Sequence, residues 1–250
     1  VTLAAGRLLL SAGIMWLLLR ILSQPMPRDR RLWGAFSVMG LFSGIVPYSL
    51  ISWGEQHISS GLAALLQSTM PIFTVVLSLL LTSEERITPR KVLGVAVGFA
   101  GVGILLLPDL REGLHASLFG QLAVVVSSIS YAGATIFARS RLRGQPPLVS
   151  TTGQLTMGAV FAIPLGLAVD RPFQITPSMA ALASWLGLSI LGTVLAYILF
   201  YLLIDRASAT FVSTVTYVIP VNGLILGALV LGEPLSANLV ISLALILLGV

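Results

Sequence analysis

The chain contains two copies of one apolar segment, each with a proline near its middle. The first copy, residues 59–81, reads SSGLAALLQSTMPIFTVVLSLLL, and the second, residues 208–230, reads SATFVSTVTYVIPVNGLILGALV. The offset between the copies is 149 residues, and it also pairs Tyr48 with Tyr197. Two copies of one apolar helical unit are typical of membrane transporters that are built from internal repeats.

The correspondence continues past these segments after one residue drops out at the following turn. Glu85-Arg86-Ile87-Thr88 then matches Glu233-Pro234-Leu235-Ser236, and Gly101-Val102 matches Gly249-Val250. Each glutamate stands just before an expected helix, where a carboxylate meets the positive end of the helix dipole and can cap free N–H groups. We interpret the two glutamates as caps, with ion coupling as the alternative.

The composition indicates that the chain folds in lipid. Only 9% of the residues are charged and 56% are hydrophobic, against roughly 25% and 45–50% in soluble domains, and the mean hydropathy is +1.01. There is no cysteine, which excludes disulfides and thiolate chemistry. The net charge of +5 does not indicate nucleic acid binding, because the basic residues lie in short loops between apolar runs, where they set topology.

Crossing the hydrocarbon core takes about 20 apolar residues in a helix. Nine runs meet or nearly meet this length: 2–22, 32–53, 59–82, 90–107, 117–138, 148–169, 179–204, 208–231 and 236–250. The sequence therefore predicts an all-α polytopic membrane protein.

The loops on alternate sides of these runs differ strongly in positive charge. The far side holds Arg111 and Arg171, with Arg7 near that end of the first run. The near side holds eleven basic residues: Arg20, Arg28, Arg30, Arg31, Arg86, Arg90, Lys91, Arg139, Arg141, Arg143 and Arg206. Because cytoplasmic loops carry the excess of arginine and lysine, we expect the near side to face the cytoplasm.

The repeat pairs the first four runs with the last four and leaves 117–138 without a counterpart. The simplest explanation is a missing helix upstream of Val1 and a truncated last helix, which gives ten helices in two five-helix units. An odd number of helices per unit predicts an inverted repeat. The loop from Glu84 to Lys91 is basic while its counterpart at 232–238 has no positive charge, as inversion requires. We place the two repeat units at 1–107 and 117–250.

The run from Trp53 to Leu105 resembles the EamA-type domain of the drug/metabolite transporter superfamily. The resemblance rests on an apolar helix centred on Met70-Pro71, on Glu85-Arg86-Ile87-Thr88 and on the glycines Gly94, Gly98 and Gly101. Similar motifs stand at Ile219-Pro220 and Gly232-Glu233-Pro234-Leu235-Ser236, and Ala5-Gly6-Arg7 resembles the start of the family's second helix.

The resemblance implies a ten-helix, exporter-like carrier in the cell (inner) membrane, with a central cavity between its halves. It does not name a substrate, because the family handles amino acids, bases, sugars and other metabolites. We interpret the glycine series as a surface for close helix packing, since nothing around it indicates a phosphate-binding loop.

Charged residues give little support for proton coupling. All nine acidic residues fall in loops or at run ends, whereas a carboxylate used as a relay would be expected inside the membrane. Arg7 is the one cation well inside an apolar run. It either snorkels to the outer surface or holds an anionic group such as a carboxylate.

Polar side chains inside the runs are the candidates for a transport pathway. Gln67, Pro71 and Thr74 recur at helical spacing and share one face, and a similar stripe runs from Ser189 to Tyr201. The alternative for each polar residue is an interhelical hydrogen bond worth about 0.6 kcal/mol. The predicted substrate-binding residues are Tyr48, Gln67, Thr74, Ser128, Tyr131, Thr193, Tyr197, Tyr217 and Asn222.

Pro71 and Pro220 interrupt the backbone hydrogen bonds in the middle of their runs. We interpret them as hinges, with a tolerated packing kink as the alternative. The predicted function is a secondary transporter that moves a small metabolite by alternating access, outward, with amino acids or related compounds as cargo. A passive pore is the main alternative, and a membrane-embedded enzyme the more distant one. The expected partners are a small-molecule substrate and the lipid bilayer, with a homodimer left open, and with no cofactor, metal or nucleic acid.

Overall fold

The computed structural model describes residues 2–82, 88–112, 115–170, 177–215, 218–232 and 236–249, without the side chains of 108–112, 213, 214 and 231. Glu85 and Glu233, interpreted above as caps, lie outside these ranges. The described residues form helices and their connections, with no strand among them.

Seven spans in the described part of the chain are long and apolar enough to cross a membrane. Single helices form four of them: α1 (Thr2–Ile21), α6 (Pro89–Glu112), α7 (Ala116–Arg141) and α8 (Pro147–Val169). Consecutive elements form the other three: α2, η1 and α3 (Arg30–Gly40, Leu41–Ile45, Val46–Gly54), α4 and α5 (Ser60–Gln67, Met70–Leu81), and α9, η3 and α10 (Met179–Ser189, Ile190–Leu195, Ala196–Ile204).

Three shorter helices complete the described chain: α11 (Ala209–Thr214), α12 (Val218–Leu231) and α13 (Ala237–Leu248). The predicted all-α, multi-pass membrane fold is confirmed. Several helices begin at a polar cap, because the first N–H groups of a helix have no partner inside it. Side chains of Asp29, Ser59, Ser178 and Ser236 accept from the backbone N–H groups at the starts of α2, α4, α9 and α13.

The chain divides into two compact units. The first unit comprises Val1–Ser49 and Phe137–Ser208, and the second comprises Leu50–Ile136 and Ala209–Val250. Each unit takes helices from both sequence copies. In the first unit, α1, α2 and η1 pack with α8, α9, η3 and α10, whereas in the second unit α4, α5 and α6 pack with α11, α12 and α13.

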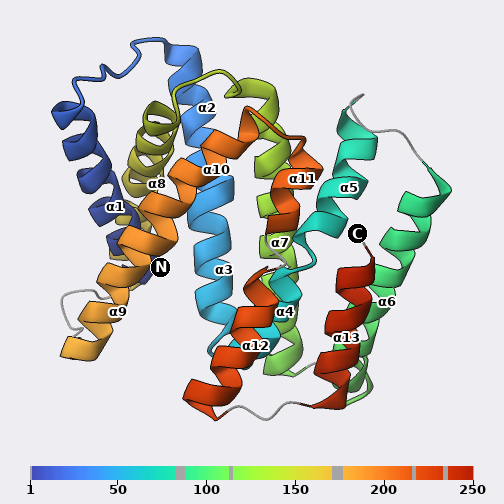
Figure 1. Ribbon diagram of the computed structural model, residues 1–250. Coiled ribbons are helices and arrows are strands. Elements are labelled where there is room, and N and C mark those ends of the chain that lie inside the picture. Colours follow the sequence, from blue (N-terminus) through green and yellow to red (C-terminus); the bar gives the residue numbers. More distant parts are fainter. Residues whose placement is uncertain are drawn as a thin grey trace. The chain divides into compact units, whose positions relative to one another are not determined.

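Helices α1 and α8 lie side by side and antiparallel in the first unit (Figure 1). The backbone N–H of Thr2 donates to Asp170, just past the end of α8, over 2.6 Å. Toward the other end of α1, the indole N–H of Trp16 donates to Thr156 over 2.9 Å. The start of α1 therefore lies at the end of α8. These two helices correspond to each other in the sequence repeat.

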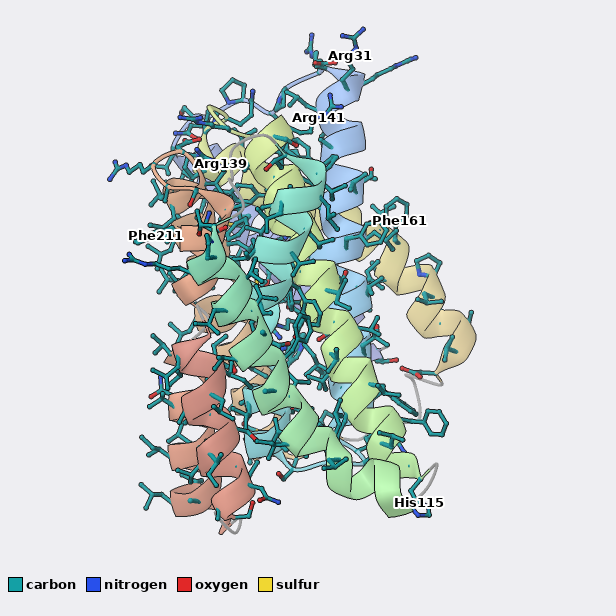
Figure 2. The ribbon with its side chains drawn as sticks, turned by 90° about the vertical axis from the view of Figure 1, so that its right-hand side faces the viewer. Arg31, His115, Arg139, Arg141, Phe161 and Phe211 are labelled. Carbon is teal, nitrogen blue, oxygen red and sulfur yellow. The ribbon has the colours of Figure 1, made fainter. Side chains whose placement is uncertain are left out.

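One end of the first unit carries a group of basic residues, whereas Arg7 lies near the start of α1 at the other end. Figure 2 shows Arg31, Arg139 and Arg141 at this end, where α2 begins and α7 stops. Arg139 donates to the carbonyl of Ile204 at the end of α10 over 2.7 Å, and the N–H of Gly144 donates to Asp205 over 2.7 Å. The charge count above assigns this end to the cytoplasm.

Glycines bring helices together in the second unit. A Cβ atom on Gly94 of α6 would lie 2.6 Å from the carbonyl oxygen of Gly249, and one on Gly101 would lie 3.0 Å from that of Ser242. The crossing is antiparallel, because the earlier residue of α6 meets the later residue after α13. The predicted close packing of this glycine series is therefore confirmed.

The first proline segment is broken into two helices at the predicted place. Helix α4 ends at Gln67 and α5 begins at Met70, so that Pro71 occupies the first turn of α5, where its missing N–H costs nothing. The turn is held by the hydroxyls of Ser68 and Thr69, which donate to the carbonyls of the preceding turn over 2.5 Å and 2.6 Å. In the second copy α11 ends at Thr214 and α12 begins two residues before Pro220.

Close backbone approach in the first unit makes one glycine of α2 sensitive to substitution. A Cβ atom on Gly40 would lie 2.5 Å from the backbone nitrogen of Gly158 and 2.9 Å from the carbonyl oxygen of Gln154 in α8. We expect Gly40→Ala to lower the free energy of unfolding by about 1–3 kcal/mol, because two backbones must move apart.

Gly34→Ala is the matched control in the same helix, since a Cβ atom there meets nothing within 4 Å. It should be neutral or stabilise by up to about 1 kcal/mol through helix propensity. Thermal unfolding in detergent measures both variants, and equal effects would contradict the packing account.

Candidate functional site

Two π-helical turns interrupt the longest spans of the first unit. They are η1 and η3, and the repeat offset superposes Leu41 at the start of η1 on Ile190 at the start of η3. Turns of this kind are rare and often occur at functional sites. The sequence analysis did not single them out, although Pro47 follows η1 and lacks the N–H that would bond to the carbonyl of Ser43 four residues earlier. A second signal was the pair Tyr48 and Tyr197, which follow the two turns at equivalent positions.

Each π turn has a backbone carbonyl that accepts a hydrogen bond from a side chain of another element. In η1 the carbonyl of Ser43 accepts from the hydroxyl of Tyr197, and the Ser43 hydroxyl lies 3.0 Å from the same phenol oxygen. In η3 the carbonyl of Gly192 accepts from Nη2 of Arg7 over 2.9 Å. Ser43 and Gly192 correspond under the offset of 149, so in both copies the equivalent carbonyl of the π turn accepts a hydrogen bond from a side chain.

Arg7 is held by three neutral groups. Besides its bond to Gly192, Nε donates to Oγ1 of Thr193 over 2.6 Å, and the guanidinium carbon lies 4.2 Å from the centre of the Tyr48 ring. Thr193 is itself fixed, because its hydroxyl donates to the carbonyl of Leu188 over 3.0 Å. Arg7 is half-buried.

The position of Thr193 shows how far the Arg7 charge lies from the span ends. Thr193 is the fifteenth residue of the 26-residue span Met179–Ile204. It is therefore roughly 20 Å along the helix from one end and roughly 16 Å from the other. Arg7 lies roughly 8 Å from the start of its own helix α1, and its side chain contacts the middle of a neighbouring span.

A second polar pair lies in the same unit, between α8 and α10. The hydroxyl of Tyr201 donates to Oε1 of Gln154 over 2.5 Å, and both side chains are buried. Within the described residues, Nε2 of Gln154 and the hydroxyls of Ser150 and Thr151 have no hydrogen-bond partner. The sequence analysis did not single out Gln154. Its signal was an amide within an otherwise apolar and hydroxyl-bearing run.

The structure brings together three of the predicted substrate-binding residues. Tyr48, Thr193 and Tyr197 lie in the first unit and make the contacts with Arg7, η1 and η3 described above. We call Arg7, Tyr48, Gly192, Thr193, Tyr197 and Ser43 the Arg7 cluster.

Four other predicted residues lie in the second unit and are placed differently. Thr74 and Ser128 are buried, and the Thr74 hydroxyl donates to the carbonyl of Met70 over 2.8 Å. The Ser128 hydroxyl lies 3.2 Å from the carbonyls of both Leu66 and Val124, between which it shares its proton. Gln67 and Tyr131 are half-buried. Ser128 thus supports the carbonyl end of α4 beside the break before Pro71. Of the remaining two residues, Asn222 is exposed on α12 and Tyr217 lies outside the described residues.

Interrupted spans with a cation and hydroxyl groups at mid-span are the architecture of membrane transporters, which bind substrates at breaks in their helices. The chain belongs to the EamA-like transporter family, whose model matches residues 1–107 and 118–250.

The chain is similar to several proteins described as transporters. An uncharacterized transporter of Archaeoglobus fulgidus is 30% identical, over 85% of this chain and 74% of the other. The uncharacterized transporter YoaV of Bacillus subtilis is 24% identical, over 98% of this chain and 83% of the other. The uncharacterized inner membrane transporter YedA of Escherichia coli K12 is 27% identical, over 93% and 74%.

A crystal structure of another protein has the same fold. The match has a TM-score of 0.72 and covers 99% of this chain and 84% of the other, with 20% sequence identity.

The buried pair between α8 and α10 gives a prediction for stability. We expect Tyr201→Phe to lower the free energy of unfolding by about 1–3 kcal/mol, because it leaves the Gln154 amide buried without its partner. Adding Gln154→Leu should recover part of that loss, since both polar groups are then removed. The coupling in a double-mutant cycle is expected at about 0.6–1.7 kcal/mol. Strictly additive effects would contradict the importance of this bond.

Proposed function

We propose that the protein is a secondary transporter that moves small metabolites across the cell (inner) membrane by alternating access and exports amino acids or related compounds. The Arg7 cluster is the observation that carries this proposal. A cation within a membrane span that bonds to groups in the middle of another span is costly to retain in lipid, and such residues usually mark a substrate pathway. The name of YedA, an inner membrane transporter, supports the location.

We propose that the two repeat units are an inverted repeat of five helices each, an arrangement that would allow alternating access, and two helix crossings support this. Repeat-related α1 and α8 run antiparallel, as described above. The crossing of α6 and α13 is symmetric as well: Gly94 meets Gly249 while Gly101 meets Ser242, and the repeat pairs 94 with 242 and 101 with 249. Two segments related by a two-fold axis make every contact twice: if residue i contacts residue j, the repeat equivalents of i and j also contact each other. Repeat units of opposite orientation can exchange conformations to open a site to either side.

The breaks in the spans supply the places where such a movement can occur. Pro71 lies in the first turn of α5, directly after the break that follows α4, and Pro220 lies in the first turn of α12. Hinges are positions at element ends that absorb a change in backbone angles. We propose that both prolines act as hinges of the second unit.

The alternatives differ in what they require. A passive pore for small solutes needs a permanent path and no conformational exchange. A membrane-embedded enzyme needs a paired acid, a nucleophile with its base, or a metal site, whereas the Arg7 cluster offers a guanidinium, hydroxyl groups and carbonyls. The transporter accounts for the cluster and the breaks together.

Counterflow in proteoliposomes tests the transporter against the pore. The full chain is reconstituted and the vesicles are preloaded with unlabelled amino acids, bases, sugars or organic acids in turn. We expect one class of internal compound to accelerate the uptake of its labelled form, because a carrier returns faster when loaded. Uptake that does not saturate and ignores the internal compound would contradict the carrier.

Pro71→Ala tests the hinge. We expect a several-fold fall in the rate of counterflow with an unchanged yield of folded protein, since an alanine allows α4 and α5 to join into one helix. Pro164→Ala is the control, because Pro164 lies inside α8, is exposed and has no proline at the equivalent repeat position. Equal rates for wild type and Pro71→Ala would show that Pro71 serves packing only.

A further inference from the structure

We infer that Arg7, Tyr48 and Thr193 form a subsite for the carboxylate group of the transported compound. The inference rests on the proposed function and adds to it the chemical class of the substrate. All three residues belong to the first unit, so the subsite is complete within it.

The first argument is the uncompensated charge of Arg7. Its partners among the described residues are a hydroxyl, a carbonyl and the face of a tyrosine ring, and none of them carries a charge. A guanidinium inside a membrane protein is normally paired with an anion, because an isolated charge in that environment is strongly unfavourable. The missing anion is therefore expected from a ligand.

The second argument is the geometry of the unused donors. A guanidinium carries five N–H donors in a planar fork. Arg7 uses the edge formed by Nε and Nη2 for Thr193 and Gly192. Both donors of Nη1 and the second donor of Nη2 have no protein partner in the described part of the chain. The free edge is the one that grips the two oxygens of a carboxylate in parallel.

The third argument is Tyr48, whose ring supports the guanidinium. By the repeat, its hydroxyl should bond to Gly192, as that of Tyr197 bonds to Ser43. Arg7 takes the Gly192 carbonyl instead. The Tyr48 hydroxyl makes no hydrogen bond to any described residue. It is not one of the polar atoms that are fully buried without a hydrogen-bond partner, so its oxygen is accessible. It is left as a further donor beside the free edge of Arg7.

The depth of the cluster favours a substrate over a lipid headgroup. Thr193 lies roughly 16–20 Å along its helix from either end and Arg7 roughly 8 Å from the start of α1, so a headgroup phosphate at the membrane surface does not reach the Thr193 end of the cluster. One guanidinium also matches the single charge of a carboxylate, whereas phosphate is commonly gripped by several cations.

Ligand-induced thermal stabilisation of the purified full chain tests the subsite without any transport assay. The probes are leucine, phenylalanine, glutamine and pyroglutamate, each paired with its carboxamide, and inorganic phosphate. The acid and amide of a pair differ in charge but hardly in shape. We expect at least one acid to raise the unfolding temperature while its amide and phosphate do not.

Variants of the cluster then assign the effect to residues. Arg7→Gln should abolish the stabilisation, and Arg7→Lys should weaken the affinity roughly tenfold to a hundredfold, because an ammonium keeps the charge but loses the fork. Tyr48→Phe removes one oxygen and keeps the ring, and should weaken the affinity about fivefold to tenfold. Arg20→Gln, an exposed arginine in the last turn of the same helix, should leave it unchanged.

Several results would overturn the inference: no stabilisation by any acid, equal stabilisation by acid and amide, stabilisation by phosphate alone, or full stabilisation of Arg7→Gln. A purely structural clamp predicts that the Arg7 variants lower the unfolding temperature of the free protein while their affinity for the acid is unchanged. Counterflow of a compound without a carboxylate would leave the proposed transport intact and remove only the subsite.

Discussion

The structure depends on one constraint, which is that backbone polar groups inside a membrane have no water to bond to. An unbroken helix meets this requirement by itself, and a broken one does not. At each described break, protein side chains supply what the helix lacks. Ser68, Thr69 and Ser128 donate to carbonyls before Pro71, and Tyr197 and Arg7 donate to those of the two π turns.

In the proposed transporter, the side chains that meet this requirement are also the ones that would contact a substrate. Tyr197 and Arg7 each reach across from another element to a carbonyl that the π turn exposes. Hydroxyl and guanidinium groups carry more than one donor or acceptor site, so satisfying the backbone does not exhaust them. Thr193 is an example, because its hydroxyl both donates to the carbonyl of Leu188 and accepts from Arg7.

The sequence was sufficient for the class of fold and for one of the breaks. Hydropathy located the spans because lipid demands long apolar runs, and Pro71 located a break because proline lacks the N–H that continues a helix. The turn η1 had a signal in Pro47, which leaves the Ser43 carbonyl without a helical partner, whereas η3 has an alanine at the equivalent position and no such signal. Gln154 escaped because its partner Tyr201 lies on another helix. The spacing of polar residues along one helix identifies Thr193 and Tyr197 as candidates. It cannot show which side chains of other helices these two residues contact.

The repeat explains why Arg7 stands out within an otherwise symmetric arrangement. If the two copies were equivalent, the Tyr48 hydroxyl would donate to the carbonyl of Gly192, as the Tyr197 hydroxyl donates to that of Ser43. Only Tyr197 makes this bond, because Arg7 occupies the place at Gly192 and rests on the Tyr48 ring. Two equal copies would line a pathway with equal, neutral groups. In the proposed carrier, a single cation in one copy would make the two sides of the pathway chemically different, and that difference would allow the carrier to orient an asymmetric compound.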